Sequence, residues 1–317
     1  MRRDDQEGTM LTLRRILCPI DLSESSRQAL IYARALSSWY EAPLTVLHVC
    51  VDLPVFEMAS PFGHSASSTV VIEEAQIAER RAAVRAFVWS AVGDNSIDVI
   101  VREGADAKAE ILKEAGNDGA SMIVMGTHGR SGIDHVLLGS VTEKVLHKSP
   151  CPILVVPPHA STVALGAPAI FKRILCAIDF STSSLLALNR ALELAQEADA
   201  RLTLLHAIEF PPALREIVFS TDADADRVHA AAEAEYLRRL RALVPARARL
   251  YCTVATRVNE GKPAREIERV AAEERADLIV MGVHGRGAVD LMVFGSNTNA
   301  VIRHAACPVL VVPTPRG

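Results

Sequence analysis

The chain has 317 residues, of which 50% are apolar and 23% are charged, so it is long enough for two domains and too apolar for wholesale disorder. Its 34 Lys and Arg against 38 Asp and Glu give a net charge of −4, and only 4% of residues are aromatic. This balance argues against a nucleic-acid partner, which needs surplus cations or stacking rings. No apolar run approaches the roughly 20 residues of a membrane span, and the N-terminus MRRDDQEGTM does not read as a secretory signal. We therefore expect no membrane partner and a cytoplasmic location.

Short apolar runs alternate with helical patterns along the first half of the chain. The predicted strands are Ile16–Ile20, Leu44–Val49, Ile97–Val101, Met122–Met125 and Ile153–Val156. The predicted helices are Ser25–Ser38, roughly Val71–Val92, Ala107–Ala115 and Ser140–His147. Because the strands are rich in Val, Ile and Leu without polar alternation, we expect a parallel sheet with helices on both faces.

The second half of the chain repeats the first. RRILCPIDLS, from Arg14, recurs as KRILCAIDFS with an offset of 158, and CPILVVP, from Cys151, recurs as CPVLVVP with an offset of 156. The matching strands are predicted at Ile174–Ile178, Leu202–Ala207, Leu250–Ala255, Leu278–Met281 and Val309–Val312. This pattern predicts two tandem α/β open-sheet domains, 1–158 and 170–317, joined by a linker at 159–169.

The last predicted strand of each half has the features of a sheet edge, since prolines flank its start. An exposed apolar edge invites pairing with another strand. We expect Ile153–Val156 and Val309–Val312 to pair and to form an intrachain pseudo-dimer. The alternative is that each edge pairs with another molecule, and a further homodimer stays open in both cases.

The six cysteines lie mostly inside apolar runs, and none forms a C-x-x-C pair. This placement predicts free, buried thiols in a cytosolic protein rather than a disulfide framework.

A glycine frame follows the fourth predicted strand of each half. Both copies read G-x-x-G, nine residues, then G-S, from Gly126 to Ser140 and from Gly282 to Ser296. Glycines let backbone amides approach a ligand, and a helix N-terminus behind them favours an anion such as phosphate. Ser140 with Glu143 also matches a capping box. The alternative is that these glycines only make tight turns.

Asp21 and Asp179 follow the first predicted strands. Strand one should lie beside strand four at the topological switch point, where open α/β sheets bind ligands. There a carboxylate can accept hydrogen bonds from a ribose hydroxyl or an adenine amine. The competing explanation is helix capping together with Ser23 and Ser181.

These motifs together resemble the universal stress protein family: I-D-[LF]-S, L-H-[VA], M-G-x-H-G-R, the glycine frame and C-P-[IV]-L-V-V-P. The resemblance covers nearly the whole chain as a tandem pair. For each half it implies a Rossmann-like open sheet of five parallel strands in the order 3-2-1-4-5, as in adenine nucleotide alpha hydrolase-like folds, with dimers built through strand five. Family members with the full glycine frame bind ATP, so the resemblance implies an adenine nucleotide as ligand.

The family's binding residues transfer onto matching positions of both halves. The adenosine end would be held by Pro19, Ile20, Asp21, Val49 and Met125 in the first half, and by Ala177, Ile178, Asp179, Ala207 and Met281 in the second. The phosphates would lie on Gly126, Gly129, Arg130, Gly139, Ser140, Val141 and Thr142, and on Gly282, Gly285, Arg286, Gly295, Ser296, Asn297 and Thr298. Asn297, Asn299 and Ala207 replace Val141, Glu143 and Val49, so we expect weaker binding in the second half.

Other candidate residues carry weaker signals. Arg130 and Arg286 either neutralise phosphate or are solvated loop charges. His128 and His284 are expected to pack in their loops, and His48 and His206 to be satisfied core histidines. No metal-ligand cluster is present, although Mg²⁺ can accompany nucleotide phosphates at hydroxyls such as that of Thr142. Leu53–Thr69 and Glu209–Thr221 are candidate lids or partner surfaces, and the alternative is that they are disordered.

No catalytic residues can be assigned, because a Walker lysine, a kinase loop and a nucleophile elbow are all missing. We expect slow turnover or none. The sequence therefore predicts a tandem stress-response protein that binds ATP as a regulatory or sensing ligand and acts on an unknown protein partner. Two alternatives stay open: a nucleotide-independent interaction module, and a weak ATPase or autokinase.

Overall fold

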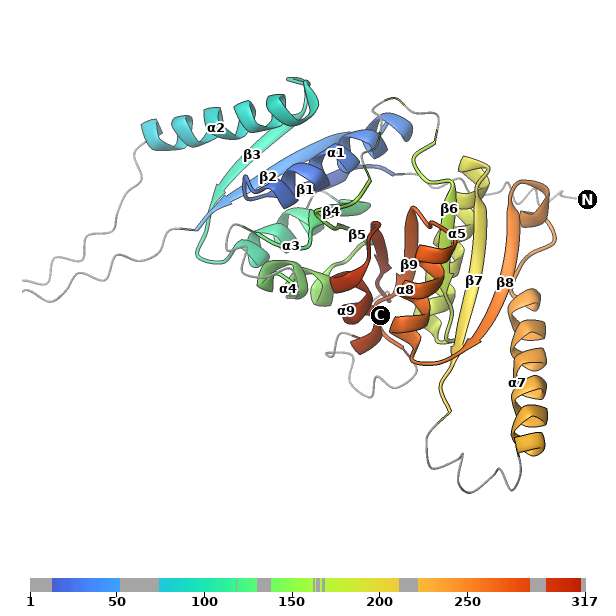
Figure 1. The fold of residues 1–317 in the computed structure, drawn as a ribbon. Helices are drawn as coiled ribbons and strands as arrows, with labels where there is room; N and C mark the ends of the chain where they lie inside the picture. The colour runs from blue at the N-terminus through green and yellow to red at the C-terminus, as the bar shows by residue number, and fades with distance from the viewer. Residues whose placement is uncertain are drawn as a thin grey trace, which may run out of the picture.

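The structure is a computed structural model that describes residues 13–51, 74–117, 119–129, 138–161, 163, 166, 169–210, 222–285 and 295–314. The first half contributes β1 (Ile16–Ile20), α1 (Glu24–Trp39), β2 (Leu44–Cys50), α2 (Glu74–Val92), β3 (Asp98–Glu103), α3 (Ala107–Asn117), β4 (Met122–Gly126), α4 (Ser140–Lys148) and β5 (Ile153–Val156). The second half contributes β6 (Arg173–Ala177), α5 (Thr182–Ala198), β7 (Arg201–Ile208), α7 (Asp222–Ala242), the 3-10 turn η1 (Ala248–Leu250), β8 (Thr253–Glu260), α8 (Pro263–Glu273), β9 (Leu278–Gly282), α9 (Ser296–His304) and β10 (Val309–Val312) (Figure 1).

All ten strands form one sheet, in the order β3-β2-β1-β4-β5-β10-β9-β6-β7-β8. The first half has the predicted order 3-2-1-4-5, and its neighbouring strands run parallel. The predicted pairing of Ile153–Val156 with Val309–Val312 is confirmed, because β5 and β10 pair antiparallel, with Leu310 opposite Leu154, and this joins the two predicted open sheets into one. All residues of both strands are buried, so the intrachain pairing removes two apolar edges from solvent.

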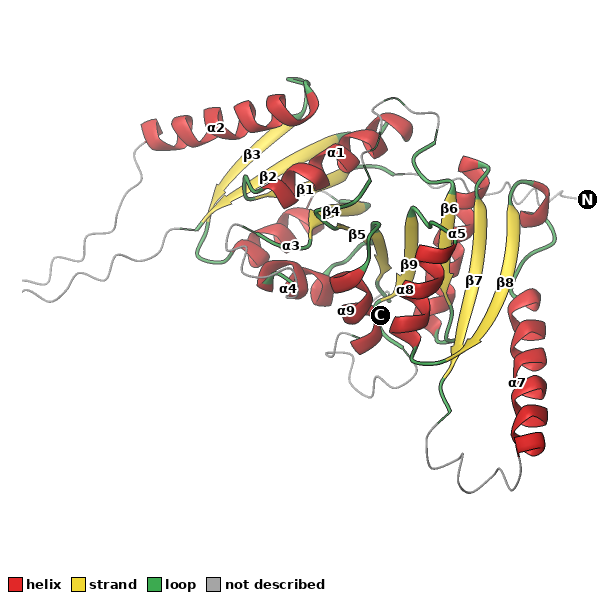
Figure 2. Ribbon diagram, in the orientation of Figure 1, coloured by secondary structure: helices red, strands yellow, loops and turns green. Residues whose placement is uncertain are grey.

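Helices cover both faces of the sheet (Figure 2). The buried side chains of α1, α2, α5 and α7 form one apolar layer with one face, and those of α3, α4, α8 and α9 form a second layer with the other. An apolar layer therefore covers each face of the sheet in both halves. Inner strands are buried on both sides, which explains the unbroken apolar runs of the sequence. The long helices α2 and α7 lie at opposite ends of the molecule (Figure 1).

The predicted linker is anchored on the first half over its described residues. Tyr32 of α1 donates a hydrogen bond from its hydroxyl to the carbonyl oxygen of Ser161, at 2.8 Å, and its ring stacks on Phe171. Ala160 is buried beside them. A second contact joins the halves, because the hydroxyl of Tyr40 donates to a carboxylate oxygen of Glu197 at 2.6 Å.

The predicted strand Leu250–Ala255 is wrong at both ends. Leu250 lies in η1 with 77% of its surface exposed, and β8 starts at Thr253 and continues to Glu260. This strand lies at the free edge of the sheet, where polar residues such as Arg257 and Asn259 are tolerated on a partly covered surface. Hydrophobicity therefore does not mark its extent.

All six cysteines are free and buried, as the sequence predicted. Burial raises the pKa of Cys151 to about 11 and that of Cys307 to about 12, so these thiols are poor nucleophiles. In the described part of the chain, no helix combines the length and the apolar character that crossing a membrane requires.

Candidate functional site

Each half has a cavity at the carboxyl ends of its strands. The first measures about 1060 Å³ and the second about 570 Å³. In the first half, β1 pairs with β4 on one side and with β2 on the other. The connections after β1 and β4 therefore leave in opposite directions, which opens a crevice at this switch point. In the second half, β6 pairs in the same way with β9 and β7.

The structure brings the sequence-predicted residues of each half together around its cavity. All of those that it describes are lining residues. In the first half these are Pro19, Ile20, Asp21, Val49, Met125, Gly126, Gly129, Gly139, Ser140, Val141 and Thr142. In the second half these are Ala177, Ile178, Asp179, Ala207, Met281, Gly282, Gly285, Gly295, Ser296, Asn297 and Thr298. Arg130 and Arg286 lie outside the described residues.

Asp21 takes part in the turn that leads into α1 and also lines the cavity. Its Oδ1 accepts a hydrogen bond from the backbone N–H of Ser23 at 3.1 Å, and the hydroxyl of Ser23 caps the helix by accepting from the N–H of Ser26. Asp179 forms the same turn with Ser181. Helix capping and a place in the cavity wall are therefore compatible, because each carboxylate has two oxygens.

A strained residue follows each aspartate. Leu22 has φ = 67° and Phe180 has φ = 62°. This left-handed conformation costs a non-glycine residue about 1–2 kcal/mol, and it recurs at the same place in both halves. Strain of this kind persists only where surrounding structure enforces it, and it is common at functional sites. Sequence inspection missed it, because nothing in Leu22 or Phe180 predicts a positive φ.

The first two glycines of each frame are required by close packing. A Cβ atom on Gly126 would collide with the hydroxyl of Ser25 and lie 2.8 Å from its carbonyl oxygen. A Cβ atom on Gly129 would lie 2.6 Å from Oδ2 of Asp21. In the second half, a Cβ atom on Gly282 would collide with Ser183, and one on Gly285 would lie 2.9 Å from Oδ2 of Asp179. These glycines thus bring the loop after β4 or β9 against the aspartate turn.

The third glycine begins the helix behind the loop. Gly139 is the N-cap of α4 and Gly295 is the N-cap of α9, and no side chain caps either helix through a hydrogen bond. The predicted capping box of Ser140 and Glu143 is therefore wrong. The N–H of Gly139 donates to the carbonyl oxygen of Thr127 at 2.8 Å, which holds Gly139 extended and makes Ser140 the first helical residue.

A buried hydroxyl in the first turn of α4 and of α9 forms a hydrogen bond to the end of the preceding strand. The buried hydroxyl of Thr142 donates to the carbonyl oxygen of Gly126 at 2.9 Å, and that of Thr298 donates to Gly282 at 3.0 Å. This bond uses the hydroxyl hydrogen, so Thr142 has only its backbone N–H to donate to an anion. Among the described residues no side chain caps the helix where it meets the cavity, so the first-turn amides face the cavity as donors.

His48 and His206 are satisfied core histidines, as predicted. Both are buried, and their Nδ1–H groups donate to the carbonyl oxygens of Ile20 at 2.9 Å and Ile178 at 2.7 Å. Each bond joins the ends of the first two strands of its half, beside the aspartate, so each histidine helps to fix the cavity floor.

His128 and His284 differ in their neighbours. Nδ1 of His128 lies 2.8 Å from the hydroxyl of Thr127, whereas Val283 replaces that threonine in the second half. Both ring nitrogens of His284 are inaccessible to solvent and have no hydrogen-bond partner among the described residues. Burial lowers the pKa of His284, and the nearby His147 lowers it further, so its ring is neutral at pH 7.

The lowered pKa of His284 predicts a loss of stability in mild acid. In the unfolded chain a histidine takes up a proton near pH 6.5, whereas the folded state resists protonation until a lower pH. Stability is therefore fully present above about pH 6.5 and falls as the pH decreases. We expect His284→Leu to flatten the decline of Tm between pH 7.5 and pH 5.5. Val283→Thr supplies a hydroxyl beside His284 and should also flatten the decline of Tm, but less than His284→Leu does. An unchanged slope in His284→Leu would contradict the assignment of this pH dependence to His284.

Sequence reasoning missed several lining residues outside the motifs. They include Arg80 of α2 in the first cavity and Tyr236 of α7 in the second. Glu209, the first residue of the candidate lid Glu209–Thr221, also lines the second cavity. They belong to no sequence motif, so only the tertiary structure shows that they line the cavities. The candidate lid Leu53–Thr69 lies outside the described residues, as does Glu209–Thr221 apart from its first two residues.

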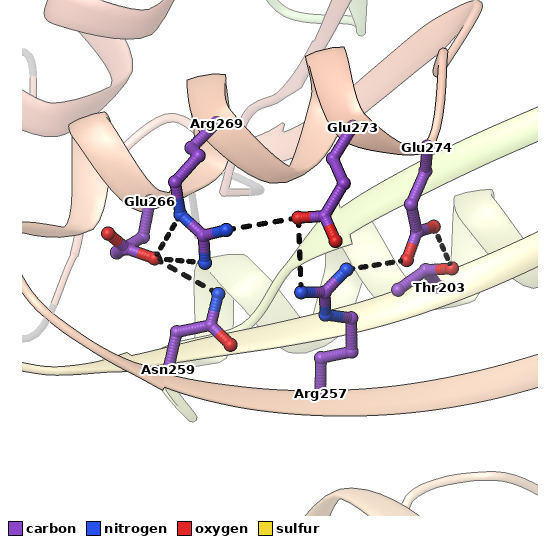
Figure 3. A network of polar contacts seen from close by, with 7 residues as sticks. All are labelled: Thr203, Arg257, Asn259, Glu266, Arg269, Glu273 and Glu274. Carbon is purple, nitrogen blue, oxygen red and sulfur yellow. Dashed lines mark hydrogen bonds and ion pairs between the residues drawn. The ribbon is translucent and has the colours of Figure 1, made fainter.

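A polar network holds the outer wall of the second cavity (Figure 3). Arg257 of β8 contacts Glu274 at 3.1 Å and Glu273 at 3.3 Å, and the hydroxyl of Thr203 donates to Glu274 at 2.6 Å. Arg269, Glu266 and Asn259 extend it along α8. The network ties β7 and β8 to α8, whose Pro263 and Ile267 line the cavity.

Among the described residues, no group of three or more His, Cys, Asp or Glu side chains is placed to hold a metal ion. What the arrangement offers is a glycine-lined turn, a helix start without a side-chain cap and a carboxylate around one crevice. These features define an α/β protein whose two crevices have a chemistry suited to an anion.

Comparison with known proteins identifies the family. The sequence profile of the Universal stress protein family matches residues 12–157 and 170–313, so the chain belongs to this family as a tandem pair. It is 28% identical over 310 residues to a universal stress protein of Mycolicibacterium smegmatis, covering 94% of this chain and 96% of that protein. It is 36% identical over 141 residues to one of Thermus aquaticus, covering 44% of this chain and 96% of that protein. The crystal structure of a universal stress protein from Archaeoglobus fulgidus has a TM-score of 0.64 at 26% identity and covers 96% of this chain and 99% of that chain.

Proposed function

We propose that this tandem universal stress protein binds ATP as a regulatory or sensing ligand. Membership in the family supports a role in stress response. The observation that carries the ATP proposal is that the described residues of the glycine frame, the aspartate turn and the helix start line one cavity in each half.

The geometry suits the parts of a nucleotide. Ile20, Val49 and Met125 offer apolar surface to a base, and Asp21 stands at the strand end as an acceptor for a ribose hydroxyl. Behind them, the start of α4 offers backbone amides to phosphate. Bound ATP would contact the described ends of the loop after β4, at Gly129 and Gly139, and so change the surface that a protein partner meets.

The decisive experiment closes one cavity at a time. In a background in which Gly285→Val and Gly295→Val block the second cavity, we expect Gly129→Val with Gly139→Val to lower ATP affinity at least 100-fold. The added side chains would displace the Asp21 carboxylate and press on the carbonyl oxygen of Thr127, 3.1 Å from a Cβ atom at Gly139. Binding is measured by titration calorimetry, and folding by circular dichroism.

Gly116→Val is the matched control, because a Cβ atom at Gly116 has nothing within 4 Å and the residue lies outside both cavities. Its ATP affinity should equal that of the background. Unchanged affinity in the Gly129 and Gly139 variant would refute the first cavity as the site. Absence of any thermal shift with ATP, and of nucleotide in the denatured protein, would favour a nucleotide-independent interaction module. Phosphate release or a labelled Ser or Thr would favour a weak ATPase or autokinase.

A further inference from the structure

The two cavities share a framework, and two of the equivalent lining positions at which they differ change the charge of the lining. Val51 follows β2 in the first half, and Glu209 follows β7 in the second with the same offset of 158 that relates His48 to His206. Arg80 of α2 and Tyr236 of α7 are related by an offset of 156, as are the buried Val84 and Leu240, which lie one helical turn further on. All four residues of the two exchanges line their cavities.

The exchanges change the charge of the cavity lining. The first cavity has the Arg80 guanidinium and an uncharged valine, whereas the second has a glutamate and an uncharged tyrosine. Relative to the first, the second cavity loses one positive charge and gains one negative charge. Asp21 and Asp179 are common to both and cancel in this comparison. A polyphosphate is therefore attracted less, or repelled, in the second cavity.

Tyr236 also changes the shape and polarity of the wall. Its ring lies 4.3 Å from that of His206 and 5.8 Å from that of Phe180, measured between centroids. Arg239 places its guanidinium 4.0 Å from the centre of the Phe180 ring, and it does not line the cavity. Of these rings, those of Tyr236 and His206 line the second cavity and that of Phe180 does not, so the Tyr236 ring offers a flat surface to a base or sugar.

The size of the second cavity agrees with this difference, and the neutral His284 does not offset it. The second cavity has about 570 Å³ against about 1060 Å³ for the first. His284 lines the second cavity, and its lowered pKa leaves it neutral at pH 7, so it adds no positive charge there.

We propose that the two halves select different adenosine ligands: the first cavity takes the nucleoside triphosphate, and the second prefers adenosine-type ligands without a polyphosphate chain. This inference rests on the proposed function and extends it. One chain would then bind two chemical forms of the same nucleoside, at sites joined by a continuous sheet.

The test compares ATP with adenosine at each cavity of the full chain. The first cavity is studied with Gly285→Val and Gly295→Val present, and the second with Gly129→Val and Gly139→Val. Titrations are carried out at pH 7.5 in EDTA, so that no divalent cation bridges phosphate to carboxylate. We expect the ratio of ATP to adenosine affinity to be at least tenfold lower at the second cavity, about 1.4 kcal/mol. If a glycine variant fails to fold, Val49→Trp or Ala207→Trp fills the corresponding cavity instead.

Replacing two residues of the second cavity by their first-half counterparts then tests the cause of the difference in selectivity. Glu209→Val with Tyr236→Arg should raise that ratio at the second cavity at least tenfold. Glu235→Val with Tyr251→Arg makes the same change of charge at exposed positions outside the cavity, and it should change the ratio less than twofold.

The outcomes separate this inference from the proposed function. If the first cavity binds neither ligand, the proposed function fails. If the first cavity binds ATP, three results overturn only the present inference. The ratios of ATP to adenosine affinity at the two cavities differ by less than tenfold, or the second cavity binds neither ligand, or Glu209→Val with Tyr236→Arg has no effect.

Discussion

Replacing Glu114 by alanine is expected to lower the free energy of unfolding by about 3 kcal/mol. Glu114 is 5% exposed, and its carboxylate lies 3.5 Å from Arg15 and 3.3 Å from Arg102. Loss of the carboxylate removes the negative charge that lies 3.5 Å from the largely buried guanidinium of Arg15. Removing one partner of a buried ion pair is costly, because the other group has already given up its hydration. Urea unfolding of the full chain measures the difference.

The control for this change is an ion pair of the same chemistry at the surface. Glu235 and Arg238 are 2.7 Å apart, but their side chains are 49% and 71% exposed. Glu235→Ala should therefore lower the free energy of unfolding far less than Glu114→Ala does. Glu114→Gln, which keeps an acceptor oxygen, should lie between the two. A loss of under about 1 kcal/mol in Glu114→Ala would show that water replaces the carboxylate.

Replacing Gly126 by alanine is expected to cost about 3 kcal/mol and to deform the first cavity. The new Cβ atom would meet the hydroxyl and the backbone of Ser25, with the Ser25 carbonyl carbon at 2.9 Å. Backbone at the start of α1 cannot rotate away as a flexible side chain can. Either α1 or the end of β4 must move, and the aspartate turn moves with α1. Guanidinium unfolding and ATP titration should both report the change.

Gly116→Ala is the matched control and should change the free energy of unfolding in the opposite direction. Gly116 lies in α3, where a Cβ atom meets nothing within 4 Å. Alanine there should stabilise the chain by about 0.5–1 kcal/mol, because glycine loses more backbone entropy in a helix. If both alanine variants were equally stable, close packing would not be the reason for glycine at position 126.

Much of the framework could be predicted, because its signals are local. β1, β4 and β5 are short apolar runs that are buried on both faces, and the glycine frame follows β4 directly. The capping box failed because the pattern at Ser140 and Glu143 does not reveal that a distant carbonyl, that of Thr127, fixes Gly139 as the N-cap. β8 was misplaced because the edge of a sheet relaxes the apolar pattern.

The amino-acid sequence by itself determined the duplication, the strand runs and the aspartate and glycine positions, since burial on both faces and tight turns restrict which residues are allowed at each place. Only the tertiary structure decided that ten strands form one sheet and that Arg80 and Tyr236 reach the two cavities. These features depend on how α2 and α7 pack across strands distant in sequence. No local pattern records that packing, because any polar or aromatic residue on the partly exposed side of a helix satisfies the same periodicity.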